Sequence, residues 1–276
     1  TIESATGTAG ATTTIQFSSG EFKDLSHQFD ILEMNGYVNL NGTVELDNTN
    51  IDPFGDSRPD KSKSTLMYNA IRPTATSEVS NLIFQWEAST LRNQLYPLGQ
   101  RFNIHNCYFY DNIGDALVIY ATDDLNSSIT DCVFENCGDG ILNVLDTGQR
   151  VKLRRNKFID NVRAVYSKGG MNLGDVTAKG TGNNPGENIF YKNSKNVRND
   201  SGIALAGEGN WWYDSQGNFL NTEPEIQSTI ENINPTPKLY GINKALGSVD
   251  VVPFQANNIL LGAEQPSSVK NAFLYE

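Results

Sequence analysis

The sequence predicts an all-β fold, a single-stranded parallel β-helix whose coils contain about 24–25 residues. Short β-rich runs recur between clusters of Gly, Asn and Asp, and the apolar spacing typical of helices is scarce. The third observation is a repeat: aligning four of these runs superimposes four phenylalanines at successive spacings of 25, 25 and 24 residues, namely Phe84, Phe109, Phe134 and Phe158. A repeat of this length cannot bury its own apolar row, so stacked coils are expected.

Other apolar residues keep the same register. One column lies five residues before the phenylalanines and another seven or eight residues after them. The first column is Ile104, Ile129 and Leu153, and the second is Leu117, Ile141 and Val165. A leucine-rich repeat has a similar length, but its helix and its leucine pattern are missing.

Polar residues also fall into columns. Asn112, Cys137 and Asn161 share one column, and the residue before each is Asp or Asn. Such residues tolerate left-handed backbone and hydrogen-bond to their equivalents in adjacent coils, so we expect them at corners. Cys107 and Cys132 share another column, where we expect stacked core thiols and no bridge. The three cysteines show no metal-binding spacing.

Three regions are predicted along the chain. Residues 1–72 form an N-terminal cap and irregular first coils, because the segment around residues 52–64 breaks the repeat. Residues 73–212 form the regular coils, with an insertion that places Phe190 32 residues after Phe158. Residues 213–276 form a C-terminal cap and tail, whose last part is the end of the cap or the start of a further module.

Composition and charge exclude some classes of binding partner. The 276 residues include 21 Lys and Arg against 32 Asp and Glu, a formal net charge of -11. This charge repels phosphate backbones and anionic lipid, so no nucleic-acid partner is expected. No apolar run is long enough to insert into a membrane. The N-terminal residues do not form a signal peptide. We expect a secreted or cell-surface protein whose signal has been removed.

The end of the repeat region resembles a known group of proteins. The segment GENIFYKNSKNVRNDSGIALAGEGNWW ends in Gly209-Asn210-Trp211-Trp212 and is followed by LGSVDVVPF. Together they resemble the last coils and tail of bacterial right-handed β-helix proteins of the pectin-lyase-like superfamily. The resemblance implies a right-handed helix and a cap that contains a short helix near residues 223–230. It implies no single activity, because that superfamily includes lyases, hydrolases, epimerases and non-catalytic binders.

Two tryptophans near the end of the repeat have two interpretations. Trp211 and Trp212 cover the apolar end of the solenoid in the first, which we favour. In the second they form a ligand-binding platform on which a sugar stacks.

Three charged residues form the most suggestive constellation. Asp115, Asp139 and Arg163 follow one another at spacings of 24 and 24, which places them side by side on adjacent coils. In the calcium-dependent lyases of the superfamily that the sequence resembles, clustered acids on one sheet face bind Ca²⁺ and a nearby Arg or Lys abstracts a proton. Asp115 and Asp139 are thus candidate metal ligands and, with Arg163, candidate catalytic residues. We favour the alternative, an exposed ladder of ion pairs.

Two further groups are candidate sites. Asp123 and Asp124 form an acidic pair that could act in glycoside hydrolysis, although a turn is the favoured interpretation. Lys152 and Arg154 should share one face of a strand, and with Lys157 and Arg163 they could bind an acidic glycan. A solvated strand face is the favoured alternative.

The expected function follows from regular coils without a complete catalytic pattern. We expect a non-catalytic extracellular protein that binds a polysaccharide or another surface protein along one solenoid face, as an adhesin, surface-layer component or spike. It would require no cofactor. The alternative is a lyase or hydrolase that acts on an acidic polysaccharide, with Ca²⁺ as a possible cofactor. A purely structural stalk is a third interpretation.

Overall fold

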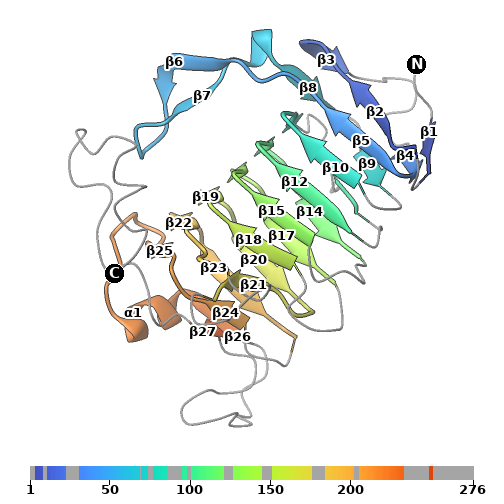
Figure 1. The fold of residues 1–276 in the computed structure, drawn as a ribbon. Coiled ribbons are helices and arrows are strands. Elements are labelled where there is room, and N and C mark those ends of the chain that lie inside the picture. Colours follow the sequence, from blue (N-terminus) through green and yellow to red (C-terminus); the bar gives the residue numbers. More distant parts are fainter. Residues whose placement is uncertain are drawn as a thin grey trace.

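The computed structural model describes residues 4–8, 11–22, 31–68, 70–73, 77–85, 95–97, 101–120, 127–144, 151–175, 184–201, 205–232 and 249–250. Within these ranges most residues lie in strands, and long parallel sheets dominate. Successive strands join three sheets in turn, so each circuit of the chain lies beside the previous one, as Figure 1 shows. This is the arrangement of a parallel β solenoid, as the repeat predicts.

The first sheet has nine strands, and each pairs in parallel with its neighbours. In spatial order they are β2 (Thr13–Gln16), β5 (Val38–Asn41), β10 (Ser77–Ser80), β12 (Phe102–His105), β15 (Ser127–Thr130), β18 (Val151–Arg154), β21 (Asn172–Gly174), β24 (Leu205–Gly207) and β27 (Val249–Asp250). In β12, β15 and β18, buried and half-buried residues alternate, which points one face of the sheet into the core.

The second sheet has eight parallel strands. In chain order they are β3 (Gly20–Phe22), β8 (Thr65–Met67), β11 (Ile83–Gln85), β13 (Tyr108–Tyr110), β16 (Val133–Glu135), β19 (Lys157–Ile159), β22 (Ile189–Tyr191) and β25 (Trp211–Trp212). Each follows a strand of the first sheet, after a short corner in most coils and after an insertion before β8 and β22.

The third sheet has five parallel strands. They are β14 (Asp115–Ile119), β17 (Asp139–Asn143), β20 (Arg163–Ser167), β23 (Lys195–Asn199) and β26 (Ile230–Asn232). Parallel bridges from Leu95 to Ile71 and Leu117 connect it to a three-stranded sheet. That sheet consists of β1 (Ser4–Gly7), β4 (Ile31–Gly36) and β9 (Ala70–Pro73).

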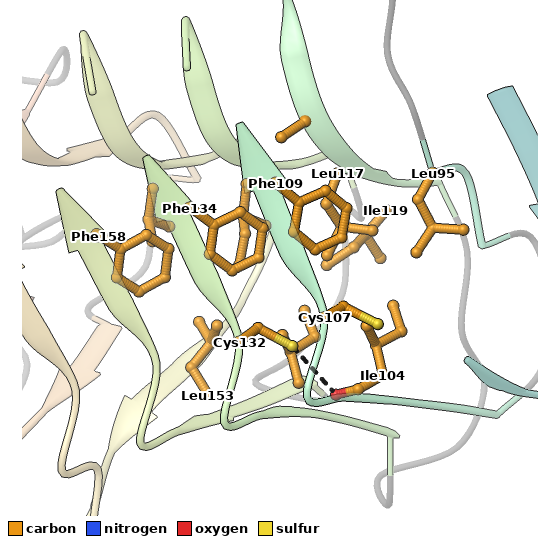
Figure 2. Packing of buried hydrophobic residues seen from close by; sticks show 14 of the residues in the cluster. Leu95, Ile104, Cys107, Phe109, Leu117, Ile119, Cys132, Phe134, Leu153 and Phe158 are labelled. Atoms are coloured by element: carbon orange, nitrogen blue, oxygen red, sulfur yellow. Dashed lines mark hydrogen bonds between the residues drawn. The ribbon is translucent and has the colours of Figure 1, made fainter. Parts of the chain in front are cut away.

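A stack of aromatic rings runs through the core. Adjacent ring centroids lie 4.3–5.0 Å apart, and the rings are nearly parallel. The rings belong to Phe84, Phe109, Phe134, Phe158, Phe190 and Trp212. Figure 2 shows three of them in a row, with Cys107 and Cys132 in a second row. The predicted phenylalanine column is confirmed, and Trp212 extends it by one coil.

The cysteines are buried and free. The thiol of Cys132 donates to the carbonyl of Ile104 in the preceding coil at 3.8 Å, the contact drawn in Figure 2. Burial raises the pKa of Cys137 to about 12, so its thiol is protonated at neutral pH. The prediction of core thiols without a bridge is confirmed.

Asparagine side chains hold the corners together. Asn161 donates from Nδ2 to the carbonyl of Phe134, and its Oδ1 accepts from the backbone N–H of Cys137, both at 2.9 Å. The residues that precede this column have positive φ, between 52° and 57°: Asp111, Asn136, Asp160 and Lys192. The predicted left-handed corners are confirmed. The buried amides of Asn161 and Asn193 bond backbone groups of the preceding coil, whereas that of Asn112 bonds backbone groups of its own corner.

Four strands before residue 72, β2, β3, β5 and β8, pair in the same sheets as later strands, whereas β1 and β4 form the three-stranded sheet with β9. The irregularity predicted there is an insertion between β5 and β8, an antiparallel hairpin of β6 (Leu46–Ile51) and β7 (Ser57–Pro59). A short 3₁₀ helix, η1 (Lys61–Lys63), follows. The segment that breaks the repeat therefore belongs largely to this hairpin.

The expected helix near residues 223–230 is present as α1 (Glu223–Ser228). The backbone N–H of Thr222 donates to the carboxylate of Glu225 at its start, and Ile226 packs into the core cluster. Among the residues described, no helix has the length and apolar character needed to span a membrane.

Candidate functional site

Four charged residues form a column at the start of the third-sheet strands. The register places Asp115 beside Asp139, Asp139 beside Arg163, and Arg163 beside Lys195. Neighbouring strands lie about 4.8 Å apart, so these side chains are within reach of one another. The structure therefore brings together the three residues that the sequence spacing selects.

The central pair of this column is an ion pair with two hydrogen bonds. Nε and Nη2 of Arg163 donate to the two carboxylate oxygens of Asp139, at 2.5 and 2.9 Å. The Asp139 side chain is 1% exposed and that of Arg163 is 27% exposed. The arginine thus supplies the compensating charge that a buried carboxylate requires.

Asp115 lies half-buried on the other side of Asp139. Burial, followed by repulsion from Asp139, raises the pKa of Asp115 to about 7, and attraction to Arg163 opposes part of this rise. Close to neutral pH the carboxyl therefore exists in both protonation states. It can give a proton to, or take one from, a molecule bound beside it.

The donor set at this column does not fit Ca²⁺. Both oxygens of Asp139 already accept hydrogen bonds from Arg163. Ca²⁺ takes six to eight oxygen ligands, which come from carboxylates, carbonyl groups and water. In the described part of the chain, no group of three or more His, Cys, Asp or Glu is placed to hold a metal ion.

A second group on the same sheet surrounds Tyr166, which is half-buried on β20. The guanidinium carbons of Arg163 and Arg198 lie 4.5 and 4.7 Å from the ring centroid, and Nζ of Lys168 lies 5.1 Å from it. The Tyr166 hydroxyl donates to Asp200 at 2.7 Å, and Arg198 also pairs with Asp200. We call Tyr166, Lys168, Arg198, Asp200 and Arg163 the Tyr166 cluster.

The Tyr166 cluster combines an aromatic ring with three cations. Guanidinium groups bind carboxylates and sulfates through paired hydrogen bonds, and the Tyr166 ring positions these cations through cation–π contacts. Arg163 belongs to both the cluster and the acidic column. The two groups therefore form one continuous candidate site on the third sheet.

Sequence reasoning did not select Tyr166, Lys168, Arg198 or Asp200. A signal was available, because Tyr166 and Arg198 lie eight positions after Phe158 and Phe190, and Lys168 and Asp200 lie ten positions after them. Extending the alignment beyond the apolar columns would have placed these residues on one outward face.

The basic residues selected from the sequence do not form one strip. Lys152 and Arg154 lie on β18 of the first sheet, where Arg154 pairs with Glu187 at 3.0 Å. Lys157 lies on the second sheet and Arg163 on the third. Corners between the strands separate cations that are neighbours in sequence.

The tryptophan pair offers no sugar-binding platform. Trp211 and Trp212 are buried, and the Trp212 ring stacks on Phe190 with centroids 4.3 Å apart. A sugar needs an exposed ring face, which neither indole presents. The acidic pair of Asp123 and Asp124 lies outside the described residues.

No protein-family model, curated protein or solved structure matches this chain. No relative therefore assigns a role to any residue of the site.

Proposed function

We propose that this protein binds an acidic polysaccharide along the outer face of the third sheet and does not cleave it. The observation that carries the proposal is the Tyr166 ring with the cations of Arg163, Lys168 and Arg198 within 4.5–5.1 Å. A uronate or sulfate group accepts hydrogen bonds from guanidinium groups, and the Tyr166 ring keeps those groups together through cation–π contacts.

Local charge is more favourable to an anionic ligand than the charge of the whole chain. The whole chain carries a formal net charge of -11, which disfavours polyanions at long range. At the third sheet the cations Arg163, Lys168, Lys195 and Arg198 lie among the carboxyl groups of Asp115, Asp139, Asp200 and Glu231, so this face does not share the acidic excess of the chain. Salt screens the repulsion between the ligand and distant charges of the protein more than it screens contacts at the site. Binding therefore depends on the charges of this face.

The proposal includes finer features of the fold and its location. The coil is right-handed, as are about 98% of parallel crossover connections. The chain around α1 caps the C-terminal end, supported by Ile226 in the core cluster and by the pairing of β26 with β23. The protein acts outside the cell as an adhesin or surface component, where long polysaccharides are accessible.

One observation favours a second function, cleavage of the same class of glycan by hydrolysis or by a lyase reaction. The Asp115 carboxyl has a pKa raised to about 7 by burial and by Asp139. A group with a pKa near the working pH is suited to acid or base catalysis. The buried, paired state of Asp139 argues against a second reacting carboxylate, so binding remains our first proposal.

Affinity measurements with defined polysaccharides test the binding function. We would use calorimetry with oligosaccharides from polygalacturonate, alginate and hyaluronan, with dextran oligosaccharides as the neutral control. Tyr166→Ala and Arg198→Ala should each weaken binding at least about fivefold, the loss of one charged hydrogen bond or one ring contact. Lys152→Ala, a cation removed from the first sheet, should leave the affinity unchanged.

Product assays on the same samples separate binding from catalysis. Absorbance of unsaturated uronates and release of reducing ends should both stay at background with all glycans. Turnover that disappears in Asp115→Asn would favour the enzyme. Two results would show that the third sheet is not the binding face. One is an affinity that is unchanged in Tyr166→Ala and Arg198→Ala, and the other is an affinity that is lost in Lys152→Ala.

A further inference from the structure

The inserted hairpin lies against the outside of the second sheet, far from the third-sheet site. Figure 1 shows β6 and β7 leaving the first coils and extending toward β19 and β22. At the tip, Asp52 and Asp56 both accept hydrogen bonds from Nζ of Lys157 on β19. Phe54 packs edge-on against Tyr191 on β22, with ring centroids 5.1 Å apart. The tip is therefore fixed by charge and by apolar contact.

The hairpin is also held nearer its base. Nε and Nη2 of Arg58 on β7 donate to the two carboxylate oxygens of Glu135 on β16, at 3.2 and 2.7 Å. Nζ of Lys61, after β7, lies 4.9 Å from the ring centroid of Tyr110 on β13. With both ends attached, the hairpin and the sheet form the two sides of an open groove.

That space is a groove of about 380 Å³. Its volume falls in the range of roughly 300–1,000 Å³ found for small-molecule sites. The hairpin side contributes Asn50 and Lys61, and the sheet side contributes Tyr110, Asp111 and Asn136. The lining is thus polar on both sides, with one aromatic ring in the wall.

One polar group of the groove is left unsatisfied. Tyr110 is 6% exposed, and its hydroxyl has no hydrogen-bond partner within the described chain. Buried hydroxyl groups are normally paired, because an unpaired one is costly. A ligand can reach this buried hydroxyl only when a lining side chain moves; Lys61 lies over the ring, and its side chain is 42% exposed.

We propose that this groove binds a neutral sugar unit, with the Tyr110 hydroxyl as one of its hydrogen-bond partners. The cations Arg58 and Lys61 balance the anions Asp111 and Glu135, so the lining favours no net charge. Amides and carboxylates together offer donors and acceptors, which matches hydroxyl groups that both donate and accept. The site is independent of the proposed function, because it lies on another sheet and takes a neutral ligand.

Saturation-transfer NMR with a panel of neutral disaccharides tests this site. The probes are cellobiose, xylobiose, lactose and N,N′-diacetylchitobiose, and at least one should receive saturation from the protein. Tyr110→Phe should weaken its binding about three- to tenfold, the value of one hydrogen bond. Tyr108→Phe, the matched change two positions earlier on β13, should have no effect.

A second variant fills the groove. Asn50 is exposed on the hairpin, so Asn50→Trp should abolish binding while the melting temperature stays unchanged. Absence of transfer to every disaccharide would overturn the proposal, as would binding that survives Asn50→Trp. Because the probes are neutral, neither result bears on binding of acidic glycans at the Tyr166 cluster.

Discussion

Arg163 holds the carboxylate of Asp139 across adjacent coils through two parallel hydrogen bonds. The two partners differ in their access to water, since the Asp139 side chain is 1% exposed and that of Arg163 is 27% exposed. If the arginine is removed, a charge stays buried without a partner. If the aspartate is removed, the guanidinium can turn into solvent. The cost of breaking this pair therefore depends on which residue is lost.

We predict that Arg163→Ala destabilises the protein by about 3–4 kcal/mol, because it leaves a buried carboxylate unpaired. Asp139→Ala should cost less, about 1–2 kcal/mol, since the freed guanidinium is solvated and Asp115 loses a repulsive neighbour. Urea unfolding at pH 7 measures both values. The double variant should be more stable than Arg163→Ala alone, and a lower stability would contradict the assigned asymmetry.

Asp115 should make stability depend on pH. Its native pKa, about 7, lies above its ordinary value of 3.8, so the folded protein binds a proton more tightly than the unfolded chain. The stabilisation is fully present below about pH 4 and is lost as pH rises through 7. Asp115→Asn stays uncharged and should therefore be more stable than the parent at pH 8, by roughly 1–2 kcal/mol allowing for solvent screening, and the difference should shrink as pH falls and vanish near pH 4.

Thermal unfolding from pH 4 to 9 measures this difference. Asp160→Asn is the control, because it removes an exposed carboxylate at a left-handed corner where Asn is well tolerated. The control should run parallel to the parent across the range. Parallel curves for Asp115→Asn and the parent would show that this carboxyl does not titrate with a raised pKa.

The repeat made much of the fold predictable from sequence. Phe109, Phe134 and Phe158 recur because each coil must fill the same space in the core, and that constraint is visible in one dimension. The corner residues were predictable for a similar reason, since left-handed backbone favours Asn and Asp. The first coils were harder to predict, because the hairpin of residues 46–59 interrupts the regular spacing of the repeat.

The candidate site was less predictable. Lys152, Lys157 and Arg163 are close in sequence, but two corners send them to three different sheets. The groove under the hairpin was invisible for the opposite reason. Its anchor joins Asp52 to Lys157, which are 105 positions apart, and no local pattern relates the two.

The buried amide of Asn156 should be more important than its size suggests. Its Nδ2 donates to the carbonyl of Ile129 and to Asn188, and its Oδ1 accepts from the backbone N–H of Cys132. Asn156→Ala should cost about 3 kcal/mol, because buried backbone groups lose their partners. Denaturant unfolding under reducing conditions measures the loss.

Asn156→Cys should be milder than Asn156→Ala. Cys132 occupies the same corner one coil earlier, and its thiol donates to the carbonyl of Ile104, the neighbour of Ile129 in the sheet. A thiol at position 156 can reach the equivalent carbonyl, so we expect about half of the alanine loss. Equal losses would mean that the thiols contribute packing alone.

The ring stack should respond to a gap at its centre. Phe134 lies between Phe109 and Phe158, with centroids 4.7 and 5.0 Å away, and is fully buried. Phe134→Ala should therefore destabilise the protein by about 3–5 kcal/mol, and Phe134→Leu by less, because leucine refills part of the cavity. Val162→Ala, at a residue that is 59% exposed, should stay within about 0.5 kcal/mol of the parent.

Because each coil contacts only its neighbours, local unfolding should spread from the damaged coil, and hydrogen exchange should rise first in β13, β16 and β19. Uniform acceleration of exchange along the solenoid would instead indicate that it unfolds as a single cooperative unit.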